Sequence, residues 1–211
     1  MQRSSIRTHM NEAVWAALQQ GVAELMSRFE TEPSHVLHVR NLAVTLFDDL
    51  SAEPGLTSED RAILDVASCL HDIGWAVTQP DGRSHHKESA RLIREHAWVG
   101  VPRSVVEWVA LVARYHRKAI PSEVDHEDFV RQALDDRRRI RWLAGLLRVA
   151  DGLDRRHIQA VQTVQAVRLG KALRIGLTGV DGMEAEILGA RKKADLLEEI
   201  SGCEVVIGGG V

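Results

Sequence analysis

The sequence has few of the features that mark secreted or membrane-spanning proteins. Only two cysteines occur in 211 residues, at positions 69 and 203, and nothing in the pattern supports a disulfide between them. Such cysteine usage is typical of a reducing compartment. No apolar run approaches the length that crosses a bilayer, and the first twenty residues contain no signal-peptide core. We therefore expect a cytoplasmic protein with no membrane partner.

The sequence also lacks a strong excess of charge of either sign. It holds 27 Lys and Arg residues against 30 Asp and Glu residues, a net charge of -3. This balance provides no broad basic surface for a nucleic-acid duplex, so we expect no partner of that class. The apolar fraction of 45% is ample for a core at this length. A homodimer stays open at this point.

Apolar spacings of three and four residues predict helices through the first three-quarters of the chain. Pro33-Ser34 and Thr57-Ser58 are typical of helix starts, and Pro54-Gly55 is typical of a break between helices. Two stretches rich in turn and polar residues, 73–84 and 117–128, are predicted as loops. The predicted helices cover about 10–30, 34–50, 58–72, 85–96, 103–116 and 137–156.

The composition changes near residue 158. Residues 160–178 are rich in Val, Ile and Thr and turn at Gly170-Lys171, which predicts a β-hairpin. Helical periodicity returns over 183–200, and CEVVI reads as a last short strand. We therefore predict a mainly α protein, with a helical bundle over 1–158 and a small α+β subdomain (hairpin, helix and short strand) over 159–211.

The most informative pair is His71-Asp72, which ends an apolar helix. Burying a carboxylate alone is expensive, so such groups are usually paired or bound to a metal. Other candidate ligands also extend apolar stripes of predicted helices, as His38 does four residues before Leu42. Facing helices of a bundle build metal sites in this way. The full set supplies four imidazoles and two carboxylates, enough for one or two divalent cations: His38, His71, Asp72, His85, His116 and Asp151.

The remaining histidines are assigned an ordinary structural interpretation: His9, His35, His96, His126 and His157. His35 lies one turn before His38 and competes with it for the same role. His86 competes with His85, which is preferred because it lies four residues before Ser89. Lys192 and Lys193 are interpreted as part of a solvated helix face.

Several strings resemble one family. HVRNLAVTLFDDL, LHDIG, HHKESARLI, LVARYHRKAIP and LLRVADGLDRRH are similar to the C-terminal HD region of exopolyphosphatase/guanosine-pentaphosphatase (Ppx/GppA) proteins. The tail AEILGARKKADLLEEISGCEVVI also resembles the small αβ end of that region, so the resemblance covers roughly residues 10–207. It implies an HD-domain helical bundle of the metal-dependent phosphohydrolase superfamily. No Gly-rich phosphate loop of the actin-like domains of those enzymes precedes His38.

The resemblance also implies roles for individual residues. His38, His71, Asp72 and Asp151 would hold a first metal, and His85 and His116 a second, with Asp72 shared between them. The mixed nitrogen and oxygen donors suit Mn, Fe, Co, Ni or Zn. Asp72, Arg117 and Lys118 are the candidate catalytic residues. The cations beside the ligands are candidates for contacting substrate phosphate: Lys87, Arg117, Lys118, Arg148 and Arg155.

Three functions are compatible with this set. The first is a phosphohydrolase acting on a nucleotide or other small phosphoester or phosphoanhydride. The second is a non-catalytic regulatory module that binds polyphosphate or a guanosine nucleotide. The third is a di-iron HD-type oxygenase, against which the basic residues beside the site argue. Metal content and phosphate release distinguish the three.

Overall fold

The computed structural model describes residues 10–50, 55–78 and 82–209. The predictions for His9 and Pro54, and much of the segment in which we expect no signal peptide, therefore lie outside the described residues. The described elements are, in chain order, α1 (Glu12–Phe29), α2 (Pro33–Asp49), α3 (Ser58–Leu70), the 3₁₀ helix η1 (Ile73–Val77), α4 (His85–Glu95), α5 (Arg103–Arg114), α6 (Glu127–Val130), α7 (Leu134–Gly152), β1 (Val161–Leu169), β2 (Ala172–Gly179), α8 (Glu184–Arg191), α9 (Asp195–Ser201) and β3 (Glu204–Ile207).

The predicted helices of the first three-quarters are confirmed, and local chemistry explains their starts. Asn11 caps α1 by accepting a hydrogen bond from the Val14 amide, and Thr57 and Asp60 form a reciprocal capping box at α3. The two predicted loops are only partly irregular. The first begins with η1, and the second runs into the short helix α6.

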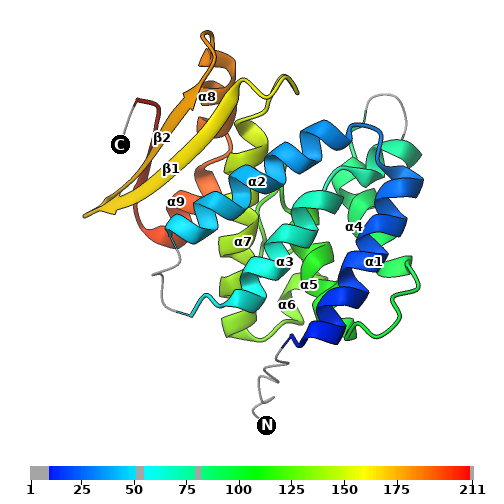
Figure 1. Cartoon of the computed structure of the whole chain (residues 1–211). Helices are drawn as coiled ribbons and strands as arrows, with labels where there is room; N and C mark the ends of the chain where they lie inside the picture. Colours follow the sequence, from blue (N-terminus) through cyan, green and yellow to red (C-terminus); the bar gives the residue numbers. More distant parts are fainter. Residues whose placement is uncertain (1–9, 51–54, 79–81, 210–211) are drawn as a thin grey trace.

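The β-hairpin and the last strand are also confirmed. β1 pairs antiparallel with β2, β2 pairs parallel with β3, and Gly170 takes the positive φ of 63° that the hairpin turn requires. Figure 1 shows this sheet along one side of the helical bundle, with α1 on the opposite side. The single helix expected over 183–200 is instead two helices, α8 and α9, separated by a turn at 192–194.

Contacts with α7 account for the break between α8 and α9. A Cβ on Gly152 of α7 would lie 2.5 Å from the Ala190 Cα of α8, so only glycine permits this approach. Further along the chain, Asp195 at the start of α9 accepts hydrogen bonds from Arg148 of α7 at 2.9–3.1 Å. The turn allows both short helices to pack on α7.

One hydrophobic core joins the helices to the sheet. It is centred on side chains of α2, α3, α5 and α7, such as Leu46, Leu70 and Leu147, and it extends to Ile175 of β2. Both cysteines are buried and free. The boundary near residue 158 stays a prediction. Among the described helices, none is both long and apolar enough to cross a membrane.

Candidate metal centre

The Asp72 carboxylate lies at the centre of the candidate site, directly after α3. Its Oδ2 atom is 3.7 Å from His71 Nε2 and 3.8 Å from His35 Nε2. Its Oδ1 atom is 3.1 Å from His85 Nε2 and 3.4 Å from His116 Nε2. One carboxylate therefore faces two pairs of imidazoles, one pair through each oxygen.

All four imidazoles are held by their other ring nitrogen. Nδ1 of His71, His85 and His116 lies 2.7–2.9 Å from the carbonyl oxygen three residues earlier in each case. Nδ1 of His35 lies 2.8 Å from Asp154 Oδ2. A carbonyl oxygen can only accept, so Nδ1 carries the proton in those three rings. Metal-binding histidines are typically oriented in this way, with Nε2 left as the ligand atom.

The donors fit a divalent cation in two groups: His35, His71 and Asp72, and Asp72, His85 and His116. Nε2 of His35 and of His71 is buried and has no hydrogen-bond partner among the described residues. Nε2 of His85 and of His116 are 3.3 Å apart, although each faces the other with a lone pair. A cation between these atoms would satisfy both, so the donor set fits the metal that the sequence led us to expect.

Asp151 lies beside the first group. Its Oδ1 atom is 3.6 Å from His35 Nε2, while its Oδ2 atom contacts the ammonium of Lys193 in a close ion pair. Our prediction that Lys193 belongs to a solvated face therefore needs correction. The turn between α8 and α9 carries this side chain to α7, which is a long-range contact that helical periodicity does not encode.

His35 occupies the place expected for His38. Both residues are on α2, but the side chain of His35 is buried against Asp72, Asp151 and Asp154. His38 is half-buried one turn later and belongs to neither group of potential ligands in the described chain, although its Nε2 is also buried without a hydrogen-bond partner there. A residue three positions along a helix lies on nearly the same face but about 4.5 Å further along the axis, which places His38 outside both groups. We therefore prefer His35 to His38 in the ligand set proposed below, and the assignment of His38 stays a prediction.

The charges of the cluster favour cation binding. Burial would raise the pKa of Asp72, but His71 and His85 hold it well below its usual range. Burial also opposes ionisation of Asp151, and Lys193 and His35 overcome that effect on its pKa. Burial and the neighbouring His71 lower the pKa of His116, which stays neutral. Both carboxylates are therefore ionised at neutral pH.

His35 differs from the other imidazoles. Burial would lower its pKa, but the carboxylates of Asp151 and Asp154 outweigh burial and raise the pKa to about 10. Without a metal, His35 is therefore cationic at neutral pH, with a proton on each ring nitrogen. A cation that binds Nε2 has to displace the proton there.

Two residues near the cluster were not singled out from the sequence. Asp154 accepts the His35 hydrogen bond, and its spacing of three from Asp151 at a helix end is the signal that the sequence offers. Trp75 stacks on His85 with ring centroids 4.3 Å apart and an interplanar angle of 28°. Nothing in the local sequence indicates that contact.

A tight turn after α3 positions Asp72 against α4. The Ser89 hydroxyl donates to the His71 carbonyl at 2.6 Å and accepts from the Gly74 amide at 2.9 Å. A Cβ on Gly74 would lie 2.1 Å from the His85 carbonyl oxygen and 2.5 Å from the Ser89 amide nitrogen, both backbone atoms. Glycine at 74 is therefore what lets Asp72 and His85 come within reach of each other.

We expect Gly74→Ala to separate η1 from α4 and to weaken metal binding at His85. Overpacking of this kind typically costs about 1–3 kcal/mol, which urea denaturation measures. Gly170→Ala is the control, because a Cβ there meets no atom within 4 Å and only the positive φ is strained. It should leave metal content unchanged. Wild-type stability and metal content in Gly74→Ala would show that the close approach is not required.

Four of the five cations predicted to contact phosphate fall into three groups. Arg117 is next to the cluster, with Nη1 at 3.2 and 3.3 Å from the two ring nitrogens of His85. Lys87 and Lys118 are exposed at the edge of a nearby cavity. Arg155 is exposed and lies against Gly189.

Arg148 is a correction to that prediction. Its guanidinium is buried and pairs with Asp195, and its Nη1 atom donates to the carbonyls of Tyr115 and Lys118. These contacts use the donors that a phosphate would need. Arg148 therefore ties α7 to α9 and to the segment after α5, and its role is structural.

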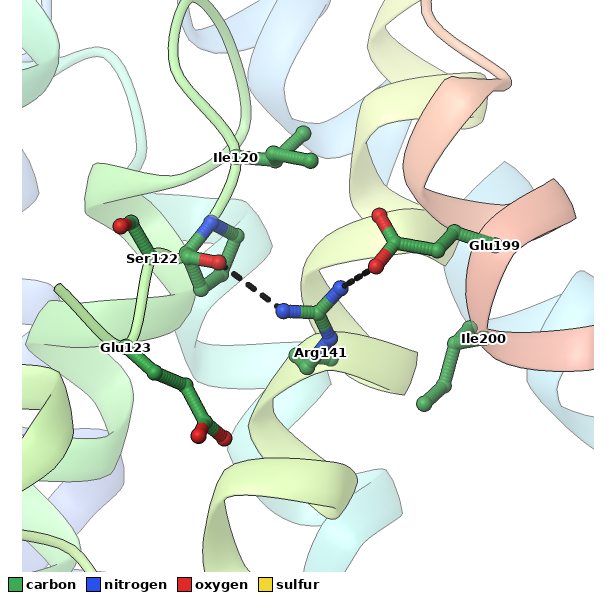
Figure 2. A pocket seen from close by; sticks show the side chains of 7 residues that line it. Ile120, Ser122, Glu123, Arg141, Glu199 and Ile200 are labelled. Atoms are coloured by element: carbon green, nitrogen blue, oxygen red, sulfur yellow. Dashed lines mark hydrogen bonds and ion pairs between the residues drawn. The ribbon is translucent and has the colours of Figure 1, made fainter.

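A cavity of about 610 Å³ lies elsewhere, between the segment 120–123, α7 and α9. Figure 2 shows Arg141 at its centre, with the guanidinium between the loop and α9. Its Nη1 atom donates to the Pro121 carbonyl at 2.9 Å and its Nη2 atom to Glu199 at 2.6 Å. The cation is satisfied, and none of the lining residues belongs to the cluster, so we do not place the site there.

Residues 18–187 match the family model of the Ppx/GppA phosphatase, domain III. The matched span takes in every member of the cluster from His35 to Asp151. The chain belongs to the Ppx/GppA phosphatase domain III family. The resemblance seen in the sequence is thereby confirmed, as is the mainly helical fold with a small sheet near the C-terminus. Lys193 and Asp195 lie beyond the span that defines this domain III match. None of the curated proteins compared with the chain matches it.

Proposed function

We propose that this domain III protein is a metal-dependent phosphohydrolase that cleaves a nucleotide or another small phosphoester or phosphoanhydride. The observation that carries the proposal is the Asp72 carboxylate, which faces one imidazole pair through each oxygen. A shared carboxylate of this kind suits two cations held close together, as in two-metal phosphatases. The family membership supports phosphate chemistry but does not assign an activity to this chain.

Different residues of the cluster would bind each of one or two divalent ions. His35, His71 and Asp151 would hold the first with Asp72 Oδ2, and His85 and His116 the second with Asp72 Oδ1. The ions would supply Lewis-acid polarisation of a phosphoryl oxygen and make water acidic enough to attack near neutral pH. Asp154 orients His35, and the three carbonyl contacts orient the other rings.

Arg117 is the residue best placed to contact the phosphate itself. Its guanidinium is half-buried against His85, and its planar fork matches the oxygens of a phosphate group. Charge that develops on those oxygens during hydrolysis would be stabilised by this cation. The predicted catalytic role of Lys118 has no comparable support, because its side chain is exposed and lines a neighbouring cavity.

The test is phosphate release from a panel of phosphorylated metabolites by chelator-treated protein. The panel is run without metal and after addition of Mn²⁺, Co²⁺ or Ni²⁺. Release that requires the added metal supports the proposal, and Asp72→Asn is the matched inactive variant. Metal binding without release from any substrate points to a regulatory module. Two bound irons with a mixed-valent signal in electron paramagnetic resonance (EPR) point to an oxygenase.

Arg117→Ala should lower kcat/KM for a hydrolysed substrate by about ten- to a hundredfold, because charge-assisted bonds to phosphate contribute about 1.5–3 kcal/mol. Metal content should stay normal, since the Arg117 side chain is not a ligand. Arg117→Lys should recover only part of the loss, because it keeps the charge but not the fork. Steady-state kinetics and metal analysis of the same samples test this. Wild-type turnover by Arg117→Ala would place the phosphate elsewhere.

A further inference from the structure

A basic cavity of about 490 Å³ lies next to the second imidazole pair. It is bounded by the start of α4 and by the end of α5 with the segment that follows. Its lining includes four basic side chains and one carboxylate: Arg83, Lys87, Arg114, Lys118 and Asp125. The Asp125 carboxylate accepts a hydrogen bond from Ser122 at 3.0 Å. A hydrogen bond from a neutral hydroxyl leaves the Asp125 charge in place, so the four basic side chains and one carboxylate give the lining a formal excess of positive charge.

The two lysines carry charge that the protein does not neutralise. Neither Lys87 nor Lys118 makes an ion pair with a residue that the structure describes, and both are exposed. Arg114 is only loosely paired, with Nη1 3.9 Å from Asp128 Oδ2. Lys118 is also held at a φ of 61°, unusual for a residue with a side chain. The cavity therefore presents unpaired cations to solvent.

The start of α4 also borders the cavity. Ser84 occupies the N-cap position and lines the cavity, and its side chain makes no capping hydrogen bond. The amides of His85 and Lys87 already donate to the carbonyls of Gly82 and Ser84, so this helix end contributes the positive end of its dipole to an anion, and not free donors. His86 supplies an independent observation. Its side chain lines the cavity with only 7% of its surface exposed, yet Nδ1 is buried without a hydrogen-bond partner in the described chain.

We propose that this cavity binds a phosphate group of its own, separate from the group that is cleaved at the metal cluster. His86 marks the boundary between the two places, with its ring centroid 6.1 Å from that of His85 and 6.4 Å from that of His116. A substrate with two or more linked phosphates could then place one at the cluster and another in the cavity. This consequence rests on the proposed function, whereas binding of the anion does not.

The test is calorimetric titration of the chelator-treated full chain with inorganic triphosphate and, separately, with inorganic phosphate. We expect saturable binding of one triphosphate, weakened by salt, with inorganic phosphate binding less tightly at the same place. Lys87→Ala/Lys118→Ala should weaken triphosphate binding about tenfold or more, because two charge-assisted contacts are lost. Lys171→Ala/Lys192→Ala removes the same charge from exposed positions outside the cavity and should leave the affinity unchanged.

The outcomes separate this proposal from the proposed function. Triphosphate binding that only the cavity variant weakens supports the site, even if no substrate is hydrolysed. Absence of saturable binding to the metal-free protein overturns the site, even if metal-dependent hydrolysis is found. Equal weakening in both double variants also overturns it, since the effect would then reflect overall charge.

Discussion

Asp72→Ala should leave the folded protein unable to retain either metal ion. Each Asp72 oxygen faces a different imidazole pair, so one substitution removes a ligand from both groups. It also leaves four clustered imidazoles without the carboxylate between them. We expect less than about a tenth of the wild-type metal content, since loss of a charged ligand contact costs about 1.5–3 kcal/mol at each ion. Elemental analysis after metal loading and desalting measures this.

Two variants make the Asp72 result interpretable. Asp72→Asn keeps the shape of the side chain and lowers metal content with less risk to folding. Asp48→Ala removes an exposed carboxylate that pairs with Arg61 on the surface, and should bind metal like the wild type. Near-normal metal content in folded Asp72→Ala protein would refute the assignment of Asp72 as a shared ligand.

His35→Ala should weaken the first metal site, whereas His38→Ala should not. His35 Nε2 faces both Asp72 and Asp151, and His35 Nδ1 contacts Asp154. The alanine variant also leaves buried carboxylates without their partner, and breaking a buried pair typically costs about 3–5 kcal/mol. His35→Ala should therefore retain about one metal of two and unfold at a lower urea concentration.

His38→Ala is the matched control, because it is the same substitution one turn along the same helix. Its metal content should equal that of the wild type. If His38→Ala loses metal and His35→Ala does not, His38 is the ligand and its replacement by His35 in the ligand set is wrong. Equal losses in both would indicate that distortion of α2, and not a ligand contact, is responsible.

The helices and the hairpin were predictable because their signals are local. Apolar residues three and four apart identified α1 to α5 and α7, and Gly170-Lys171 marked the turn of the hairpin. The break between α8 and α9 could not be predicted, because it depends on contacts with Gly152 and Arg148 of α7. A pattern within 183–200 contains no information about those partners.

The site was predictable in part for the same reason. His71, Asp72, His85 and His116 were placed by motif and by helix face, and the structure brings these four together. His35 also has a detectable signal in the sequence. It lies four residues before Val39 and seven before Leu42, both buried, so its stripe is longer than that of His38. Lys193 has no such signal, because its partner Asp151 is 42 residues away in the chain.

The most direct test of a shared Asp72 is EPR spectroscopy of the chelator-treated protein as Mn²⁺ is added under anaerobic conditions. We predict that two equivalents bind and that the second produces the signal of an exchange-coupled Mn²⁺ pair, which Asp72→Asn does not give. Saturation at one equivalent, or two equivalents with only uncoupled signals, would contradict a pair of ions held by one carboxylate.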